Sequence, residues 1–147
     1  MCTVSYIALE NGFVLTSNRD ETSSRPTLVP AEYNINGLCL IFPKDELAEG
    51  SWIACDKNGQ VSCLLNGAFK KHKRSLPYGR SRGKVLLESF NFKDISTFIT
   101  MVNLSDVEPF TLIIVKNDAL NELKWDGVKK HVKYLDATKN HLWSSAT

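Results

Sequence analysis

Cysteine is the second residue of the chain, and an Asn-Arg-Asp-Glu cluster follows in 17-SNRDE-21. The initiator methionine is normally removed when the second residue is as small as cysteine, and Cys2 then carries a free α-amine. That amine has a reference pKa of about 7.7–8.0, so it can serve as the general base for its own thiol. A nearby cation such as Arg19 favours the reactive thiolate. The alternative is a small buried apolar residue, which is the commoner fate of a cysteine.

A predicted β-hairpin connects Cys2 to this cluster. Residues 2–9 and 13–18 are rich in strand formers, and Asn11-Gly12 lies between them. An Asn-Gly pair between two such segments is the strongest short-range signal for a type I′ turn. We therefore expect Asn11 and Gly12 to take the two central positions of the turn.

The register that follows from this turn places Val4 opposite Arg19 and Cys2 opposite Glu21. Cys2 and Arg19 then share one face of the hairpin as diagonal neighbours, roughly 7–8 Å apart at the backbone. The guanidinium is expected to reach the sulfur and lower the pKa of the thiol. Asp20 points to the opposite face unless a bulge or the end of the strand turns it toward the same site.

Length and composition indicate one globular domain over residues 1–147. The hydrophobic fraction is 43% and the charged fraction 23%, which are ordinary values for a soluble protein. The 18 basic and 16 acidic residues leave a formal charge of +2, too balanced for binding a phosphate backbone, so we expect no nucleic-acid partner. No apolar run approaches the ~20 residues of a membrane span, so we expect no transmembrane segment.

The four cysteines, at positions 2, 39, 55 and 63, form no C-x-x-C pair and have no histidine at metal-ligand spacing. We therefore expect reduced thiols, no metal site and no cofactor. The N-terminus lacks a basic region followed by an uninterrupted apolar stretch, which argues against a secretory signal. A thiol-reducing, cytoplasmic location is the expectation.

Beyond the hairpin the pattern predicts strands, then two helices, then strands again. Pro26, Pro30 and several turn formers favour an extended surface loop over residues 22–34. The order predicts an α+β protein in which helices cover one face of an antiparallel sheet. The other expected elements are a strand over 38–42, a loop over 43–50, a hairpin of 52–55 and 60–66, helices starting after Ser81 and near Asp94, and strands over 110–116, 120–125 and 128–135.

Basic residues crowd into 69-FKKHKRSLPYGRSRGK-84, which is interrupted by Pro77 and Gly79. This pattern favours a solvated loop that runs into a helix start. The alternative interpretation is a contact for an anionic group of a substrate or for an acidic lipid head group.

Three segments resemble the Asn-Arg-Asp-Glu family, also called the transport and Golgi organisation protein 2 family. Met1-Cys2, 17-SNRDE-21 and Arg25-Pro26 form the first segment. The second, 50-GSWIACDKNGQVSCLLN-66, is similar to the family's Gly-Thr-Trp-Leu-Gly segment and its strand ending in Thr-Asn, and 80-RSRGKVLLE-88 is the third. The resemblance covers much of the chain, and Cys2 together with 18-NRDE-21 is its most specific part.

The resemblance implies an N-terminal nucleophile hydrolase-like fold, which is a four-layer α/β/β/α sandwich of antiparallel sheets and helices. Within that superfamily, the family is similar to the bile salt hydrolase and penicillin V acylase branch, whose enzymes cleave non-peptide C–N bonds. The resemblance also places 141-HLWSSAT-147 in the middle of family members. We therefore expect the C-terminal part of the sandwich to be missing from the chain. A retained Met1 would block the α-amine.

By position, the resemblance also implies roles for seven residues: a nucleophile, its two partners, an oxyanion donor and three substrate-binding side chains. A preorganised amide aimed at a developing oxyanion contributes about 3–4 kcal/mol to transition-state stabilisation, and a residue that ends a strand suits this role. The residues are Cys2 as nucleophile; Arg19 and Asp20 as its partners; Asn66 as oxyanion donor; and Asn18, Glu21 and Arg82 as substrate-binding residues.

Three functions are compatible with the sequence, because a fold does not fix a function. The first is an amidohydrolase in which a small amide acylates Cys2 and water then hydrolyses the thioester. The second is a non-catalytic carrier of haem or an acyl lipid, in which Cys2 is a ligand and His72, His131 or His141 assists. Eukaryotic family members are linked to haem or lipid handling, mitochondria and secretory-pathway organisation. The third is an interaction protein that uses residues 22–34 and the basic loop as its binding surface. The oligomeric state does not follow from the sequence.

Overall fold

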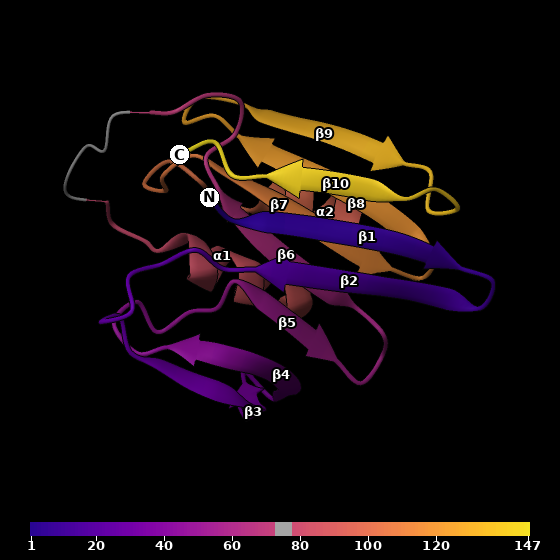
Figure 1. The fold of residues 1–147 in the computed structure, drawn as a ribbon, viewed down its shortest axis with the longest axis horizontal. Coiled ribbons are helices and arrows are strands. Elements are labelled where there is room, and N and C mark those ends of the chain that lie inside the picture. Colours follow the sequence, from indigo (N-terminus) through magenta and orange to yellow (C-terminus); the bar gives the residue numbers. More distant parts are fainter. Residues whose placement is uncertain (73–77) are drawn as a thin grey trace.

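The computed structural model describes residues 1–72 and 78–147 (Figure 1). The middle of the predicted basic loop, residues 73–77, lies outside the described residues. The described elements, in chain order, are β1 (Thr3–Leu9), β2 (Gly12–Asn18), β3 (Thr27–Ile35), β4 (Leu38–Asp45), β5 (Ile53–Asp56), β6 (Val61–Asn66), α1 (Arg82–Glu88), the 3-10 helix η1 (Ser89–Asn91), α2 (Ile95–Met101), β7 (Phe110–Lys116), β8 (Ala119–Trp125), β9 (Lys130–Leu135) and β10 (His141–Ser144).

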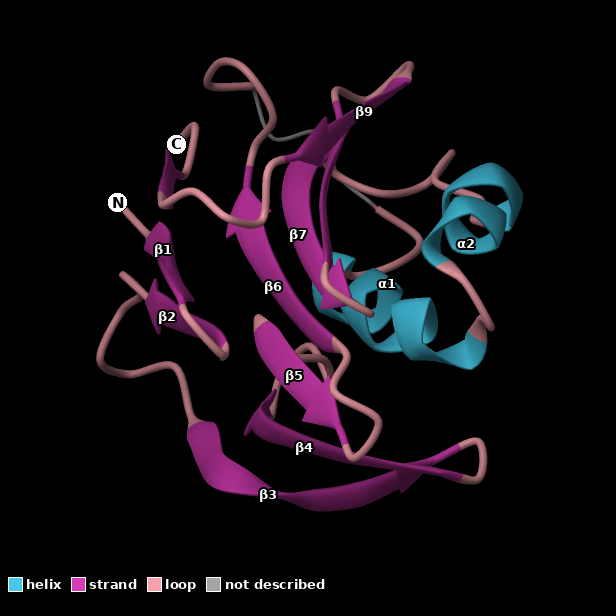
Figure 2. Ribbon diagram, turned by 90° about the vertical axis from the view of Figure 1, so that its right-hand side faces the viewer, coloured by secondary structure: helices cyan, strands magenta, loops and turns pink. Residues whose placement is uncertain are grey.

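The strands form two antiparallel sheets. The larger sheet has the order β3-β4-β5-β6-β7-β8-β9, and the smaller one has the order β10-β1-β2. Figure 2 shows the small sheet on one side of the large sheet and both helices on the other. The predicted α+β class is therefore confirmed, and the described residues form three layers: helices, large sheet and small sheet.

Strand β7 lies inside the large sheet, between β6 and β8, and is buried on both faces. Leu112 and Ile114 belong to the apolar cluster under the helices, whereas Ile113 and Val115 belong to the cluster under the small sheet. This division follows from the alternation of side chains along a strand. Val4 of β1 is fully buried in the second cluster, so packing against the large sheet fixes the strand that follows Cys2.

The register of the first hairpin differs from the predicted one by two residues. Leu9 pairs with Gly12, so Glu10 and Asn11 form the turn and Gly12 begins β2. Gly12 therefore lies directly after the turn, and not inside it. Its φ of +115° is a backbone conformation that glycine adopts readily. Hairpins in which a type I turn is followed by a residue with positive φ have this arrangement, and an Asn-Gly pair suits it as well as a type I′ turn.

The corrected register keeps each side chain on its predicted face, because side chains alternate with a period of two residues. Val4 lies opposite Ser17 rather than Arg19, and β2 ends at Asn18. Cys2 and Arg19 are thus the next residues beyond the paired part of the hairpin.

The prediction of an extended loop over residues 22–34 is wrong, because β3 begins at Thr27. Pro26 immediately precedes the strand, and Pro30 lies within the irregularity in register between Leu28 and Ala31. β3 is an edge strand of the large sheet. Both prolines therefore occupy the positions at which a strand tolerates a missing N–H.

The predicted helix starts are confirmed. The Ser81 hydroxyl accepts a hydrogen bond from the Lys84 N–H at 3.3 Å, and α1 follows it. The Asp94 carboxylate accepts from the Thr97 N–H at 2.7 Å, and α2 follows it. Both are N-caps of the usual kind.

The short strand His141–Ser144, which pairs with β1, was not predicted.

Candidate active site

A cavity of about 280 Å³ lies at the end of the first hairpin. Its wall combines the chain start, the segment after β2, the turn between β4 and β5, the end of β6 and the start of α1. Six of the seven residues expected at the site line this cavity: Cys2, Arg19, Asp20, Glu21, Asn66 and Arg82.

Asn18 is absent from the described lining of this cavity. It is exposed, and its side-chain amide donates a hydrogen bond to the Thr3 hydroxyl at 3.4 Å. Since Asn18 is the last residue of β2, its side chain points to the face opposite to that of Ser17, which lines the cavity.

The Cys2 thiol is half-buried and lies against the backbone of Asp20. Its sulfur accepts a hydrogen bond from the Asp20 N–H at 3.2 Å and lies 3.7 Å from the Asp20 carbonyl oxygen. The Asp20 carboxylate forms an ion pair with the terminal ammonium of Met1. Because β2 ends at Asn18, the chain beyond it turns Asp20 into the site. A strand end was one of the two ways, besides a bulge, in which we expected Asp20 to reach the site.

The backbone nitrogen of Cys2 has a partner from the other end of the chain. Its N–H donates to Ser145 Oγ at 3.0 Å, and the Ser145 N–H donates to the Cys2 carbonyl at 2.9 Å. Ser145 is only 5% exposed, and its hydroxyl oxygen lies 3.2 Å from Thr147 Oγ1. Sequence reasoning missed Ser145, and the signal that would have found it is the pairing of β10 with β1.

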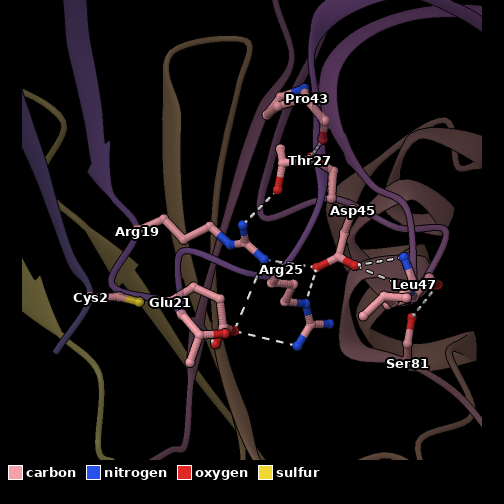
Figure 3. A network of polar contacts seen from close by, with 12 residues as sticks. Cys2, Arg19, Glu21, Arg25, Thr27, Pro43, Asp45, Leu47 and Ser81 are labelled. Carbon is pink, nitrogen blue, oxygen red and sulfur yellow. Dashed lines mark hydrogen bonds and ion pairs between the residues drawn. The ribbon is translucent and has the colours of Figure 1, made fainter.

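The Arg19 side chain extends toward Asp45 rather than toward the Cys2 sulfur (Figure 3). It donates to Thr27 Oγ1 at 2.9 Å and to Asp45 Oδ2 at 2.8 Å. Its guanidinium also lies over the Trp52 ring, 4.3 Å from the ring centroid. The expectation of a guanidinium folded over the sulfur is therefore wrong, because a buried carboxylate attracts this cation more strongly than a neutral thiol does.

Asp45 holds two arginines on one wall of the cavity. Besides Arg19, it accepts from Arg25 Nε at 2.7 Å and from the Ala48 N–H at 3.0 Å. Burial raises the pKa of Asp45, but the Ala48 N–H and the two guanidinium groups outweigh it and hold the pKa below its usual value. Glu21 completes the cluster, with its carboxylate 3.4 Å from Arg25 and 4.0 Å from Arg19.

Arg82 belongs to the other wall. It lies 3.3 Å from the Glu108 carboxylate and donates to the Pro109 carbonyl at 3.4 Å. Glu108 also lies 3.6 Å from His72 Nε2. Sequence reasoning missed Glu108, which holds Arg82 at the cavity and lies in the segment between α2 and β7.

Close backbone contact brings the start of α1 to the cavity. A Cβ atom on Gly50 would lie 2.6 Å from the carbonyl carbon of Gly83, which is closer than real Cβ contacts. Glycine at position 50 therefore lets the turn after β4 pack directly on the first residues of α1. Arg82 immediately precedes Gly83, so this contact also fixes where Arg82 enters the wall.

Asn66 is the last residue of β6, as expected for the oxyanion donor. Its carbonyl accepts a hydrogen bond from the Ala146 N–H at 3.0 Å, and its side-chain amide makes no hydrogen bond within the described part of the chain. The next residue, Gly67, has a φ of +79°, and a Cβ there would lie 2.5 Å from the Ala146 oxygen. The segment after β10 therefore contacts both Cys2 and the end of β6.

Burial is the largest influence on the Cys2 thiol and raises its pKa. The terminal ammonium of Met1, Arg19 and Arg82 each lower the pKa, whereas Glu21 raises it. The net effect is a pKa above the ordinary value, because desolvation outweighs the cations. The expectation that Arg19 makes the thiol acidic is therefore wrong for the chain that carries Met1: Arg19 acts in the predicted direction but does not prevail.

A family model for transport and Golgi organisation 2 matches residues 1–146 of the chain. The chain belongs to this family. The match confirms the resemblance drawn from Cys2, 17-SNRDE-21 and the two later segments, and it spans all of the residues that line the cavity. Among curated proteins, no relative matches the chain. Within the described ranges, no helix combines the length and apolarity that crossing a membrane requires.

None of the three histidines, all of which are described, lines the cavity of this family member. His131 Nε2 lies 2.7 Å from Asp126, and His141 Nε2 lies 2.8 Å from the Asp136 carbonyl. The Cys2 thiol therefore faces the cavity without an imidazole beside it. The four cysteines are free thiols.

Proposed function

We propose that this protein is a cysteine N-terminal nucleophile amidohydrolase that cleaves a non-peptide C–N bond in a small linear amide. The observation that carries the proposal is the position of Cys2: its thiol lines the cavity, and its nitrogen is held beside that thiol by Ser145. Family membership and the two packed antiparallel sheets, with helices on one side, support an N-terminal nucleophile hydrolase-like fold.

Removal of Met1 is the first step of the proposed mechanism. Met1 is 69% exposed, so an aminopeptidase can reach it. Its loss moves the terminal ammonium from Met1 to Cys2, where it lies nearer to the sulfur, and releases Asp20 from its ion pair with Met1. The closer cation opposes the effect of burial and lowers the pKa of the thiol.

The chemical steps then need no group beyond Cys2, the amide and water. The neutral α-amine takes the thiol proton, the sulfur attacks the amide carbonyl carbon, and a tetrahedral oxyanion forms. The C–N bond breaks as the α-ammonium returns the proton to the leaving amine, and a thioester remains on Cys2. Water, deprotonated by the same amine, attacks the thioester. The C–S bond breaks, the α-ammonium returns the proton to the departing sulfur, and the carboxylic acid and the free thiol are released.

Other residues of the cavity have supporting roles in this proposal. Asn66 donates its side-chain amide to the oxyanion. Arg82 and Glu21 contact the substrate, while the Asp20 N–H holds the sulfur in place. Arg19, which is bound to Asp45, shapes the wall and supplies positive charge without touching the thiol.

The test is turnover of a panel of N-acyl p-nitroanilides by the protein without Met1, followed by the release of p-nitroaniline. We expect turnover by the wild type, loss of turnover in Cys2→Ala, and unchanged turnover in the matched control Cys39→Ser, since Cys39 is exposed on β4. Acid quenching should trap an acyl group on Cys2, visible by intact mass.

Turnover that is equal in the wild type and in Cys2→Ala would refute the proposal. Saturable binding of an acyl lipid or haem in the cavity, with no acyl-enzyme and no turnover of any amide, would instead favour the carrier function. The absence of a cavity-facing histidine makes the haem version of that alternative the weaker one.

A further inference from the structure

We infer that Ser145 is a positioning residue for the α-amine of Cys2 and holds that amine ready to accept the thiol proton. The inference rests on the proposed function in one respect, because it requires the free α-amine that removal of Met1 creates. The nitrogen that donates to Ser145 Oγ at 3.0 Å in the chain with Met1 is the same atom that becomes this amine.

Cys2 is held by the protein at three atoms. Ser145 Oγ accepts from its nitrogen, the Ser145 N–H donates to its carbonyl, and the Asp20 N–H donates to its sulfur at 3.2 Å. The nitrogen and the sulfur are therefore fixed from opposite ends of the chain. This arrangement restricts rotation of both groups and keeps the base and the nucleophile of one residue in a defined relation.

The Ser145 hydroxyl has two hydrogen-bond partners, the Cys2 nitrogen and the Thr147 hydroxyl. Ser145 Oγ lies 3.2 Å from Thr147 Oγ1, and either hydroxyl can donate in this pair. In both cases Ser145 Oγ, which has two lone pairs, accepts from the Cys2 nitrogen. When the thiol proton moves to the α-amine, an S–H bond breaks and an N–H bond forms. The resulting ammonium donates to Ser145, which stabilises the pair of thiolate and ammonium relative to the neutral pair.

Burial makes this hydrogen bond important. Ser145 is 5% exposed, so water cannot readily replace its hydroxyl once it is removed. An ammonium left with one fewer acceptor in a half-buried site is less stable, and the thiolate that depends on it forms at higher pH. The predicted result of removing the hydroxyl is an upward shift in the pH at which the Cys2 thiol becomes reactive.

The experiment measures the rate of Cys2 alkylation by iodoacetamide from pH 5 to 10, using the full chain without Met1. The carbon–iodine bond breaks as the carbon–sulfur bond forms, and peptide mass spectrometry separates Cys2 from the other three cysteines. For Ser145→Ala we expect the midpoint to rise by about one pH unit and the rate at pH 7 to fall about tenfold. Ser145→Thr, which keeps the hydroxyl, should restore both.

Two controls separate positioning from a general loss of structure. Ser144→Ala removes an exposed hydroxyl from the adjacent position and should leave the profile unchanged. A chain with leucine inserted between Met1 and Cys2 keeps the terminal methionine, and in that chain Ser145→Ala should change the midpoint little, because Cys2 then has no amine to protonate. Circular dichroism confirms that each variant is folded.

Equal alkylation midpoints in folded wild type and Ser145→Ala would overturn the inference, even if amide hydrolysis were found. A midpoint that shifts equally with and without the inserted leucine would also overturn it, because the effect would then not pass through the α-amine. Conversely, a Ser145-dependent midpoint in a protein that hydrolyses no amide would support the inference and refute the proposed function alone.

Discussion

Replacing Asp45 with asparagine tests the cluster that forms one wall of the cavity. The substitution keeps the shape of the side chain but removes the charge that compensates Arg19 and Arg25. Loss of one partner from a buried ion pair costs about 3–5 kcal/mol. The side chains of Arg19 and Arg25 are 19% and 32% exposed, so water offsets part of that cost. We expect Asp45→Asn to lower the free energy of unfolding by about 2–3 kcal/mol at pH 7.

The pH dependence of this difference follows from the pKa of Asp45, which the fold holds below its usual value. A carboxyl whose folded pKa is depressed contributes stability above its unfolded pKa and loses that contribution as the pH falls through the folded pKa. The wild type should therefore be more stable than Asp45→Asn at pH 5–7. The difference should begin to shrink below about pH 4, where Asp45 becomes protonated in the unfolded chain, and it is lost as the pH falls through the lower pKa of the folded state.

Urea unfolding at pH 7, 5 and 3, followed by circular dichroism, measures both effects. Asp118→Asn is the matched control, because Asp118 is exposed and should change the stability by less than about 0.5 kcal/mol. Equal stability of wild type and Asp45→Asn at pH 7, or a difference that persists undiminished at pH 3, would refute this account of the wall.

Other substitutions test the oxyanion donor, the helix start and the backbone contact. Asn66→Ala should reduce kcat for amide hydrolysis by about 10²- to 10³-fold with little change in stability, measured by p-nitroanilide turnover; an unchanged kcat would exclude Asn66 as the donor. Ser81→Ala should lower the free energy of unfolding in urea by about 1 kcal/mol, because it removes the N-cap of α1; no loss would contradict that role. Gly50→Ala should destabilise the protein by about 1–3 kcal/mol, because its Cβ would meet the Gly83 backbone, and thermal melting that matches the wild type would show that the contact relaxes freely.

Local signals were sufficient for the elements that depend on local interactions. Ser81 and Asp94 cap their helices as predicted, because an N-cap bond joins residues three apart. The hairpin of β5 and β6 also lies where the sequence predicts it. The order of the predicted strands and helices was enough to predict the α+β class.

Elements whose stability depends on distant partners were predicted less well. The loop expected over residues 22–34 includes Pro30, but an edge position and an irregular register accommodate that proline in β3. The first hairpin was displaced by two residues, because Asn11-Gly12 fits two turn types and both registers keep each side chain on the same face.

In the candidate site, too, residues marked by local sequence signals were predicted better than contacts that depend on distant parts of the chain. Residues close to Cys2 or in a recognisable motif, such as Arg19 and Asn66, were expected near the cavity and line it. The direction of the Arg19 guanidinium was not predictable, because Asp45 is an ordinary acidic residue until the fold buries it. Ser145 was missed because its contact with Cys2 spans almost the whole chain.

Whether Cys2 is the nucleophile is tested by the intact mass of the protein without Met1 after brief exposure to an amide substrate and acid quenching. We expect a single acyl adduct, located on Cys2 by peptide mapping. We expect no adduct in the chain whose terminal methionine is retained by an inserted leucine. An adduct on Cys39, Cys55 or Cys63 instead, or equal acylation of Cys2 with and without Met1, would contradict the claim that the free N-terminal cysteine is the nucleophile.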